Sequence, residues 1–133
     1  MRTPYDTLAR LRQRELDEKR LDLAAAEERV QTAAERLQAI EQQSVAQAEV
    51  ASVLVEFDFS QFRRRLRASA EAAAADRRHA EMGLEAARQR GIEAFIAKKA
   101  VDLAADRYRE GQELRAARSE QSRLDEIAAR TNR

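Results

Sequence analysis

The sequence has no cysteine and no tryptophan, and its 133 residues include one proline and three glycines. Without cysteine there can be no disulfide and no thiolate metal site. Aromatic residues make up only 5%, so strands and tight turns have few of the residues that usually build them. No stretch approaches the ~20 consecutive apolar residues of a membrane-spanning helix. These absences leave long helices as the expected structure.

Alanine, arginine, glutamate, leucine and lysine together supply 81 of the 133 residues. Such a share, combined with helical periodicity, is typical of coiled coils. Alanine alone accounts for 28 residues, so bulky side chains are too few for an ordinary globular core. A narrow seam between two alanine-rich helices needs fewer of them. We therefore predict an all-α fold, in which two long antiparallel helices form a single coiled-coil hairpin domain over residues 1–133.

The first helix is predicted over about residues 4–55. Thr3 is a suitable N-cap, Pro4 fits the first helical position, and Asp6 supplies an early acid. Beyond Leu23 the seam advances in steps of three and four, as a coiled coil requires. Leu8 and Leu11 lie off this seam, which predicts a register shift near residue 14. The predicted seam comprises positions 16, 23, 26, 30, 33, 37, 40, 44, 47, 51 and 54.

The turn is predicted at about residues 56–60, where three of the four phenylalanines cluster. Asp58 and Ser60 could each cap the following helix, and Asp58 with Gln61 has the spacing of a capping box. The phenylalanines form either a hydrophobic plug at the end of the hairpin or a surface that binds a partner.

The second helix is predicted over about residues 60–130 and is the longer of the two. Pairing around a turn at 57–58 would place Pro4 opposite about Gln112, so the second helix should lose its partner near Gly111. The segment beyond Gly111 should be a lone helix, which is marginal by itself and suited to docking. The predicted seam comprises positions 62, 66, 69, 73, 77, 80, 84, 87, 91, 94, 98, 101, 105 and 108.

The sequence offers no catalytic constellation, metal site or cofactor site. His79 is the only histidine, so a helical zinc-protease motif is excluded, and a lone histidine among charged residues is usually solvated. The three glycines are isolated and form no phosphate-binding loop. No serine has the surroundings of an activated nucleophile. Two helices should also offer no deep pocket. We therefore expect a protein that is not an enzyme and works by binding other proteins.

The net charge is +1, which argues against nucleic acid as the main partner. The densest basic cluster follows the predicted turn. It is either a solvated face or a docking site for an acidic partner, because arginine binds carboxylates with several donors. A nucleic-acid site is a third possibility, disfavoured by nearby acids (Glu49, Glu56 and Asp58). The cluster comprises Arg63, Arg64, Arg65 and Arg67.

Three short elements of the chain carry a family resemblance: the C-terminal run from Ser122 to Arg130, the pair Phe62-x-x-x-Leu66 and the opening Leu8-x-x-Leu11. They resemble elements of the FliJ family of flagellar export proteins. The C-terminal run from Ser122 to Arg130 is similar to that family's hydrophobic-Asp-Glu-hydrophobic-Ala element. The pair Phe62-x-x-x-Leu66 resembles an element at the start of its second helix, and the opening Leu8-x-x-Leu11 is also similar. The chain departs from the family where many members have late tyrosines in the first helix, since it has Gln43 and Gln47 there. It also has Ala73 in place of a family histidine.

This resemblance implies a stalk-like, chaperone-escort component of a type III protein export apparatus. The implied partners are a hexameric export ATPase, the export gate membrane protein and export chaperones. By position, Phe62 and Leu66 would face the gate. The ATPase-facing tail residues would be Leu124, Asp125, Glu126 and Ile127.

The expected location is the cytoplasm, because the N-terminus lacks the apolar run of a signal peptide. The family resemblance further implies a position at the cytoplasmic face of the inner membrane. We expect a monomeric hairpin with no cofactor, no nucleic-acid partner and no direct membrane insertion. Two alternatives remain open from the sequence. One is the equivalent protein of an injectisome, and the other is a structural coiled-coil scaffold or dimerisation protein.

Overall fold

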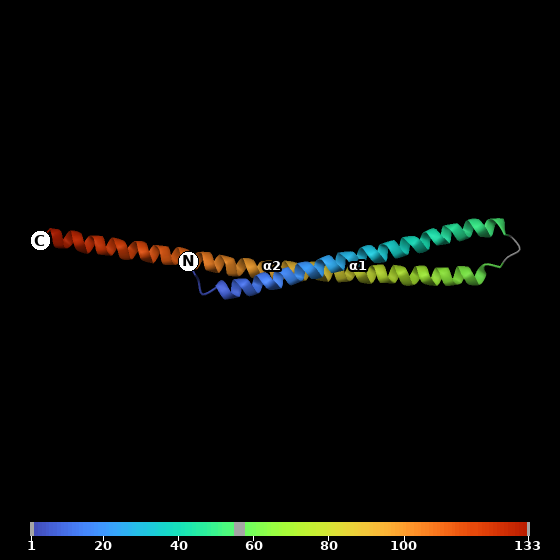
Figure 1. The fold of residues 1–133 in the computed structure, drawn as a ribbon, viewed down its shortest axis with the longest axis horizontal. Coiled ribbons are helices and arrows are strands. Elements are labelled where there is room, and N and C mark those ends of the chain that lie inside the picture. The colour runs from blue at the N-terminus through green and yellow to red at the C-terminus, as the bar shows by residue number, and fades with distance from the viewer. Residues whose placement is uncertain (1, 55–57, 133) are drawn as a thin grey trace. The chain divides into compact units, whose positions relative to one another are not determined.

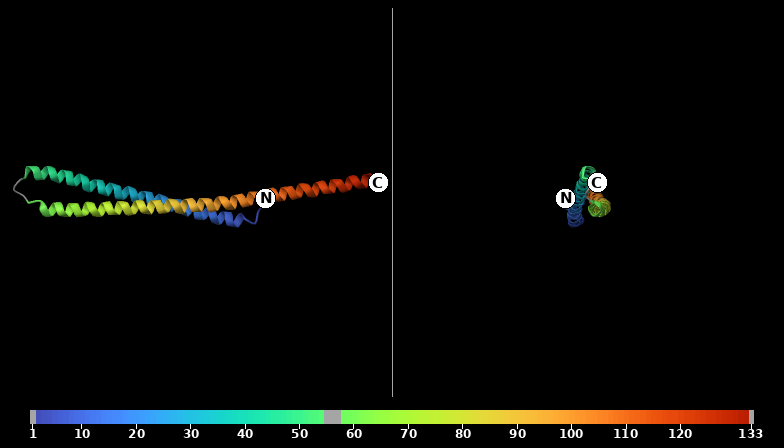
Figure 2. Two further views of the ribbon diagram at one scale, coloured as in Figure 1. Left: turned by 180° about the vertical axis from the view of Figure 1, so that it is seen from behind. Right: turned by 90° about the vertical axis from the view of Figure 1, so that its right-hand side faces the viewer.

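The computed structural model describes residues 2–54 and 58–132, and these contain two helices, α1 (Asp6–Val53) and α2 (Ser60–Thr131). The helices run antiparallel as a hairpin, and α2 is longer, with 72 residues against 48 (Figures 1 and 2). The predicted fold class is therefore confirmed. The predicted turn falls partly on residues 56 and 57, which lie outside the described residues. Residues 58 and 59 precede α2 and are not helical.

The chain divides into two compact units, and each contains a segment of both helices. Unit 1 consists of Met1–Asp17 and Glu93–Arg133, and unit 2 consists of Glu18–Ile92. The expectation of one domain over the whole chain stays a prediction.

In unit 1, α1 begins with a reciprocal cap between Thr3 and Asp6. The Thr3 hydroxyl donates to Asp6 Oδ1 at 2.7 Å, and the Thr3 N–H donates to Asp6 Oδ2 at 3.2 Å. The Tyr5 N–H donates to Thr3 Oγ1 at 3.3 Å. The Thr3 hydroxyl therefore accepts from the backbone of the first turn and donates to the Asp6 carboxylate. Thr3 thus acts as the predicted cap, but the helix itself begins at Asp6, two residues after the predicted first helical position at Pro4. Asp6 completes a capping box that was not among the sequence-based predictions.

The seam of unit 1 contains small and aliphatic residues, with Leu16 at 4% exposure and Val101 and Ala105 similarly buried. Ahead of Leu16, half-buried Tyr5, Ala9 and Arg12 continue the seam toward the N-terminus in steps of three and four. The predicted register shift near residue 14 is therefore wrong. Leu8 and Leu11 are exposed because they lie outside a seam whose register does not change.

The seam of unit 2 depends largely on alanine. Ala26, Ala73 and Ala87 are buried, with exposures of 4%, 2% and 6%. From residue 16 to 51, every predicted α1 seam position is buried or half-buried, whereas Leu54 is 52% exposed. On α2 the predicted positions Ser69 and Arg77 are exposed, and half-buried Ala70 lies beside Ser69. Alanine at the contacts lets the helices approach closely but buries little apolar area per residue.

Candidate partner-binding surfaces

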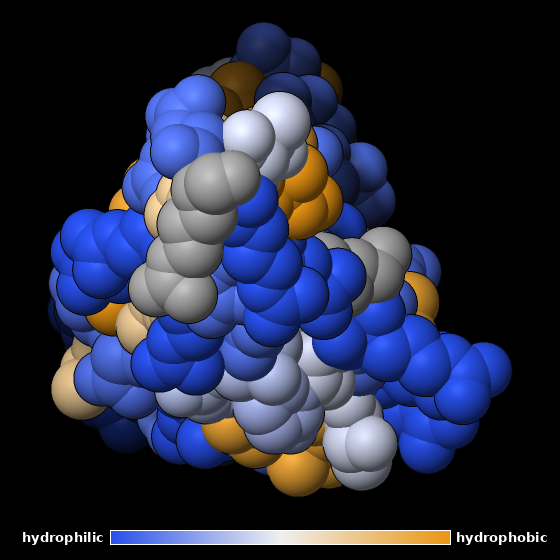
Figure 3. Space-filling model, turned by 90° about the vertical axis from the view of Figure 1, so that its left-hand side faces the viewer, coloured by the Kyte–Doolittle hydropathy of each residue, from blue (hydrophilic) through white to orange (hydrophobic). Residues whose placement is uncertain are grey.

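The last part of α2 has no neighbour within unit 1. Gln112 is half-buried, and every described residue from 113 to 132 is exposed. This confirms the expectation that the helix loses its partner near Gly111. Figure 3, which views the molecule onto the C-terminal end, shows a mostly hydrophilic surface with separate apolar patches. A helix without a packed face depends on propensity alone and gains stability by docking.

Apolar side chains stand out on this exposed tail, defined here as residues 113–132. Leu124 is 54% exposed and Ile127, one helical turn further, is 59% exposed. Asp125 accepts a hydrogen bond from Gln121 Nε2 at 3.2 Å, and Glu126 is exposed. The predicted tail residues thus combine two accessible apolar side chains with two carboxylates.

At the other end of α2, the predicted pair Phe62 and Leu66 differs in accessibility. Leu66 is 9% exposed and belongs to the seam, whereas Phe62 is 37% exposed. Of the family positions further along α2, Ser69 is exposed and Ala73 is buried. Only Phe62 of the pair therefore offers substantial surface to a partner.

Hollows lie on both sides of Phe62, within unit 2. One has a volume of about 470 Å³ and is lined by Phe59, Phe62 and Leu66 of α2 and its approach. The other has a volume of about 390 Å³ and also includes Phe62 and Leu66. The cause of the larger hollow is visible in the sequence, because the α1 seam positions between Ile40 and Leu54 hold only small or polar residues. The α1 residues that line the larger hollow are Ser44, Gln47, Ala48 and Ala51.

The four clustered arginines are all exposed, but they do not lie in equivalent places. Arg63 and Arg67 line the larger hollow, and Arg65 lines the smaller one. Arg64 lines neither of them. None of the described residues that line the larger hollow carries a carboxylate. The structure thus divides a cluster that is uniform in sequence into three groups, of which only Arg63 and Arg67 share a hollow.

The approach to α2 is fixed by Asp58. The Ser60 N–H donates to Asp58 Oδ1 at 2.9 Å, which satisfies one of the amides at the start of the helix. This backbone hydrogen bond, helped by Ser60's side chain and by the charge of Arg63, lowers the pKa of the Asp58 carboxyl below its ordinary value. The prediction that Asp58 caps this helix is confirmed, but the acceptor serves Ser60 and no hydrogen bond to Gln61 accompanies it.

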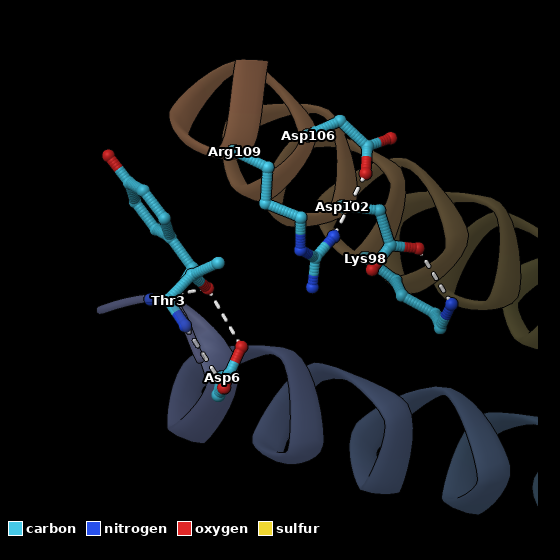
Figure 4. A network of polar contacts seen from close by, with 7 residues as sticks. Thr3, Asp6, Lys98, Asp102, Asp106 and Arg109 are labelled. Atoms are coloured by element: carbon cyan, nitrogen blue, oxygen red, sulfur yellow. Dashed lines mark hydrogen bonds and ion pairs between the residues drawn. The ribbon is translucent and has the colours of Figure 1, made fainter. Parts of the chain in front are cut away.

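The N-terminal cap of unit 1 lies beside charged residues of α2 (Figure 4). Arg109 extends from α2 toward the Thr3–Asp6 cap and forms an ion pair with Asp106 at 3.1 Å. The Thr3 hydroxyl, more than the neighbouring charges, lowers the pKa of the Asp6 carboxyl below its ordinary value of 3.8. Tyr5 completes the contact by placing its ring against Tyr108. This contact lies about one helical turn from the predicted pairing of Pro4 with Gln112.

His79 lines a third hollow, of about 620 Å³, in unit 2. The expectation that two helices offer no deep pocket stays a prediction. The alanines that line this hollow include Ala25, Ala33, Ala73 and Ala80. His79 itself is exposed, as expected for a lone histidine. Within the described residues, no group of three or more His, Asp or Glu side chains could hold a metal ion.

Sequence reasoning did not single out one exposed apolar surface of unit 1. Phe95, Ile96 and Leu103 are 47%, 60% and 55% exposed, and Lys99 Nζ lies 5.7 Å from the centre of the Phe95 ring. At 100° per residue these side chains lie on the side of α2 opposite Val101. The sequence pattern that could have predicted this surface is a second helical stripe at positions 96, 99 and 103. Among residues 2–54 and 58–132, no helix has the length and apolarity to cross a membrane.

An α-helical hairpin with accessible apolar residues at its turn end and along an unpaired tail defines a class of helical protein-binding proteins. Comparison with protein families identifies the family within this class. The family model described as "Flagellar FliJ protein" matches residues 1–133. The chain belongs to the FliJ family and is a flagellar export-related protein, from a family of non-catalytic export components. This confirms the family resemblance. No curated protein and no solved structure matches the chain.

Proposed function

We propose that this chain is a stalk-like coiled coil of the flagellar protein export apparatus, and that it acts by binding, without catalysis of its own. Its partners in this proposal are the hexameric export ATPase, the export gate membrane protein and export chaperones. The chain works as a monomeric hairpin at the cytoplasmic face of the inner membrane, associated there through these proteins. Membership of the FliJ family over the whole chain supports this proposal.

The observation that carries the proposal is the exposed tail at residues 113–132. It is helical to Thr131, yet every described residue in it is exposed. Leu124 and Ile127 supply apolar anchors, and Asp125 and Glu126 supply charge beside them. A helix that presents anchors at this spacing suits a groove on a partner. We assign the tail to the ATPase contact.

The gate contact is assigned to the turn end, at Phe62 with Leu66. Phe62 is 37% exposed and lines both hollows, so a partner side chain that enters either hollow can contact its ring. Leu66 contributes indirectly. It is only 9% exposed, so its role is to support Phe62 and not to offer surface to the partner. Aromatic side chains in such positions commonly dominate binding energy.

The ATPase contact is tested by pull-down with the hexameric export ATPase and by measuring ATP hydrolysis. We expect the Leu124→Ala/Ile127→Ala variant to weaken binding at least tenfold, about 1.4 kcal/mol or more, because two anchors are removed. Leu114→Ala is the matched control, since Leu114 is an equally exposed leucine of the tail outside the motif. Wild-type swimming of a deletion strain, together with no ATPase binding, would refute the proposal.

The gate contact is tested with the cytoplasmic part of the export gate protein. Phe62→Ala should weaken its binding while helicity by circular dichroism stays unchanged, because the ring is not part of the buried seam. Met82→Ala, at a residue of α2 with 72% exposure, is the control for loss of an exposed apolar side chain. Equal binding by the Phe62→Ala variant and the control would remove Phe62 from the contact.

A further inference from the structure

The larger hollow beside Phe62 combines an apolar floor with a cationic rim. Phe59, Phe62 and Leu66 supply the apolar side chains, and Arg63 and Arg67 supply the charge. The two arginines are four residues apart on α2, so their side chains are neighbours on one side of the helix. A ligand that fills this hollow must therefore satisfy an apolar surface and two guanidinium groups together.

The hollow exists because the two helices supply unequal side chains at this end of unit 2. On α1 the lining consists of Ser44, Gln47, Ala48 and Ala51, which are small or polar. Phe62 consequently remains 37% exposed, although it follows the spacing of the seam. A partner side chain can take the place that a large α1 residue would occupy in a regular coiled coil.

Among the described residues, the charge that lines this hollow is basic. None of the described lining residues carries a carboxylate, and neither Arg63 nor Arg67 takes part in the ion pairs that join described residues. Asp58, at the approach to α2, accepts a hydrogen bond from the Ser60 N–H, and the charge of Arg63 helps to lower the pKa of its carboxyl. Elsewhere on α2, Arg77 and Arg109 are paired with Glu81 and Asp106.

We infer that this hollow docks an acidic segment of a protein partner, which inserts an apolar side chain against Phe59 and Phe62 and places carboxylates on Arg63 and Arg67. Guanidinium groups bind carboxylates with paired hydrogen bonds. Binding therefore depends on the orientation of the carboxylates as well as on their charge. Nucleic acid fits less well, since the hollow is apolar at its floor and the whole chain carries a charge of only +1. The inference rests on the proposed function in that the export gate would supply the segment.

The test uses the full chain and a fluorescein-labelled synthetic peptide of alternating glutamate and phenylalanine, with binding followed by fluorescence anisotropy. Arg63→Glu/Arg67→Glu should weaken binding by about tenfold or more, since two attractive charges become repulsive. Arg64→Glu is a control within the same cluster, because it reverses one charge outside both hollows. Arg65→Glu reports on the smaller hollow. Both single variants should change affinity less than about twofold.

Further measurements separate this site from general charge attraction. Arg63→Lys/Arg67→Lys should retain part of the affinity, and added salt should weaken binding of the wild type. A peptide with serine in place of phenylalanine should bind more weakly, as should one with lysine in place of glutamate. Equal losses in the Arg64→Glu and Arg63→Glu/Arg67→Glu variants would overturn the inference. So would a single-stranded oligonucleotide that binds as tightly as the peptide.

Failure of this inference differs from failure of the proposed gate contact. If the peptide does not bind but Phe62→Ala still weakens gate binding, the gate contact stands and the acidic ligand is wrong. If the peptide binds as described but gate binding is insensitive to Phe62→Ala, the hollow recognises an acidic segment of another protein. Circular dichroism verifies that the variants fold, which is expected because all four arginines are exposed.

Discussion

Tyr5 and Tyr108 pack edge to face, with ring centroids 6.4 Å apart and an interplanar angle of 75°. Tyr5 lies in the N-terminal capping segment and Tyr108 lies on α2, so the contact joins two segments of unit 1 that are remote in sequence. It is the last aromatic contact before the tail begins. Edge-to-face pairs gain beyond their area burial because the positive edge of one ring meets the negative face of the other.

A double-mutant cycle of Tyr5→Ala and Tyr108→Ala should give a coupling energy of about 0.5–1.5 kcal/mol. The measurement is the amide hydrogen exchange of the first turns of α1, which this contact holds against α2. Phenylalanine at both positions should retain the coupling, because the ring contact is preserved. Strictly additive effects of the two alanine substitutions would show that the rings do not stabilise each other.

The Thr3–Asp6 cap should make the first turn of α1 sensitive to acid. The pKa of Asp6 is lowered in the folded chain, so its contribution is present above the unfolded value of about 3.8. That contribution is lost as the pH falls through the lower folded value. The protection of the first-turn amides, taken relative to their intrinsic exchange rates at each pH, should therefore fall below about pH 3.8. Asp6→Asn should remove this pH dependence, and an unchanged profile in that variant would contradict the assignment.

Removing the hydroxyl of Thr3 should destabilise the same turn at neutral pH. Thr3 is 8% exposed and both donates to Asp6 and accepts from Tyr5, so Thr3→Ala should cost about 1 kcal/mol. Thr3→Ser keeps the oxygen and should cost only a small part of that. The difference is measured by urea unfolding followed by circular dichroism, and equal losses in the two variants would argue that the hydroxyl is unimportant.

Buried and exposed leucines should respond differently to truncation. Leu16 is 4% exposed in the seam of unit 1, so Leu16→Ala should destabilise by about 2–5 kcal/mol. Leu124 is 54% exposed on the tail, so Leu124→Ala should change stability by less than about 0.5 kcal/mol. Thermal unfolding of the isolated protein makes the comparison. A large loss in the Leu124 variant would mean that the tail packs within the chain.

Glycines within α2 should be replaceable with a gain in stability. A Cβ added at Gly83 or Gly111 meets nothing within 4 Å, and neither residue has a positive φ. Because alanine loses less backbone entropy than glycine in a helix, each replacement should stabilise by about 0.5–1 kcal/mol. The melting temperature of the Gly83→Ala/Gly111→Ala variant measures this. A lower melting temperature would indicate that one of these glycines serves a close approach in the assembled state.

Most of the helical architecture is readable from the sequence, because helix propensity and seam spacing act over many consecutive residues. The spacing of the residues was enough to predict the α1 seam from Leu16 to Ala51. The capping residues Thr3 and Asp58 indicated where the two helices begin. Leu8 and Leu11 misled the reading, since a local pair of leucines was taken as evidence for a new register. Burial shows that small and polar residues, including Ala9 and Arg12, occupy the seam there.

The sequence by itself determined that this chain forms two long helices and belongs to a family of export proteins, because composition, periodicity and short motifs are local properties. Only the tertiary structure decided which residues of the Phe62–Leu66 pair and of the arginine cluster are accessible to a partner. It buried Leu66 while leaving Phe62 accessible, and it separated Arg63 and Arg67 from Arg64. The physical reason is that the accessibility of a side chain on α2 depends on the opposing helix. There Ser44, Gln47 and Ala51 leave a hollow, which cannot be predicted from the α2 residues alone.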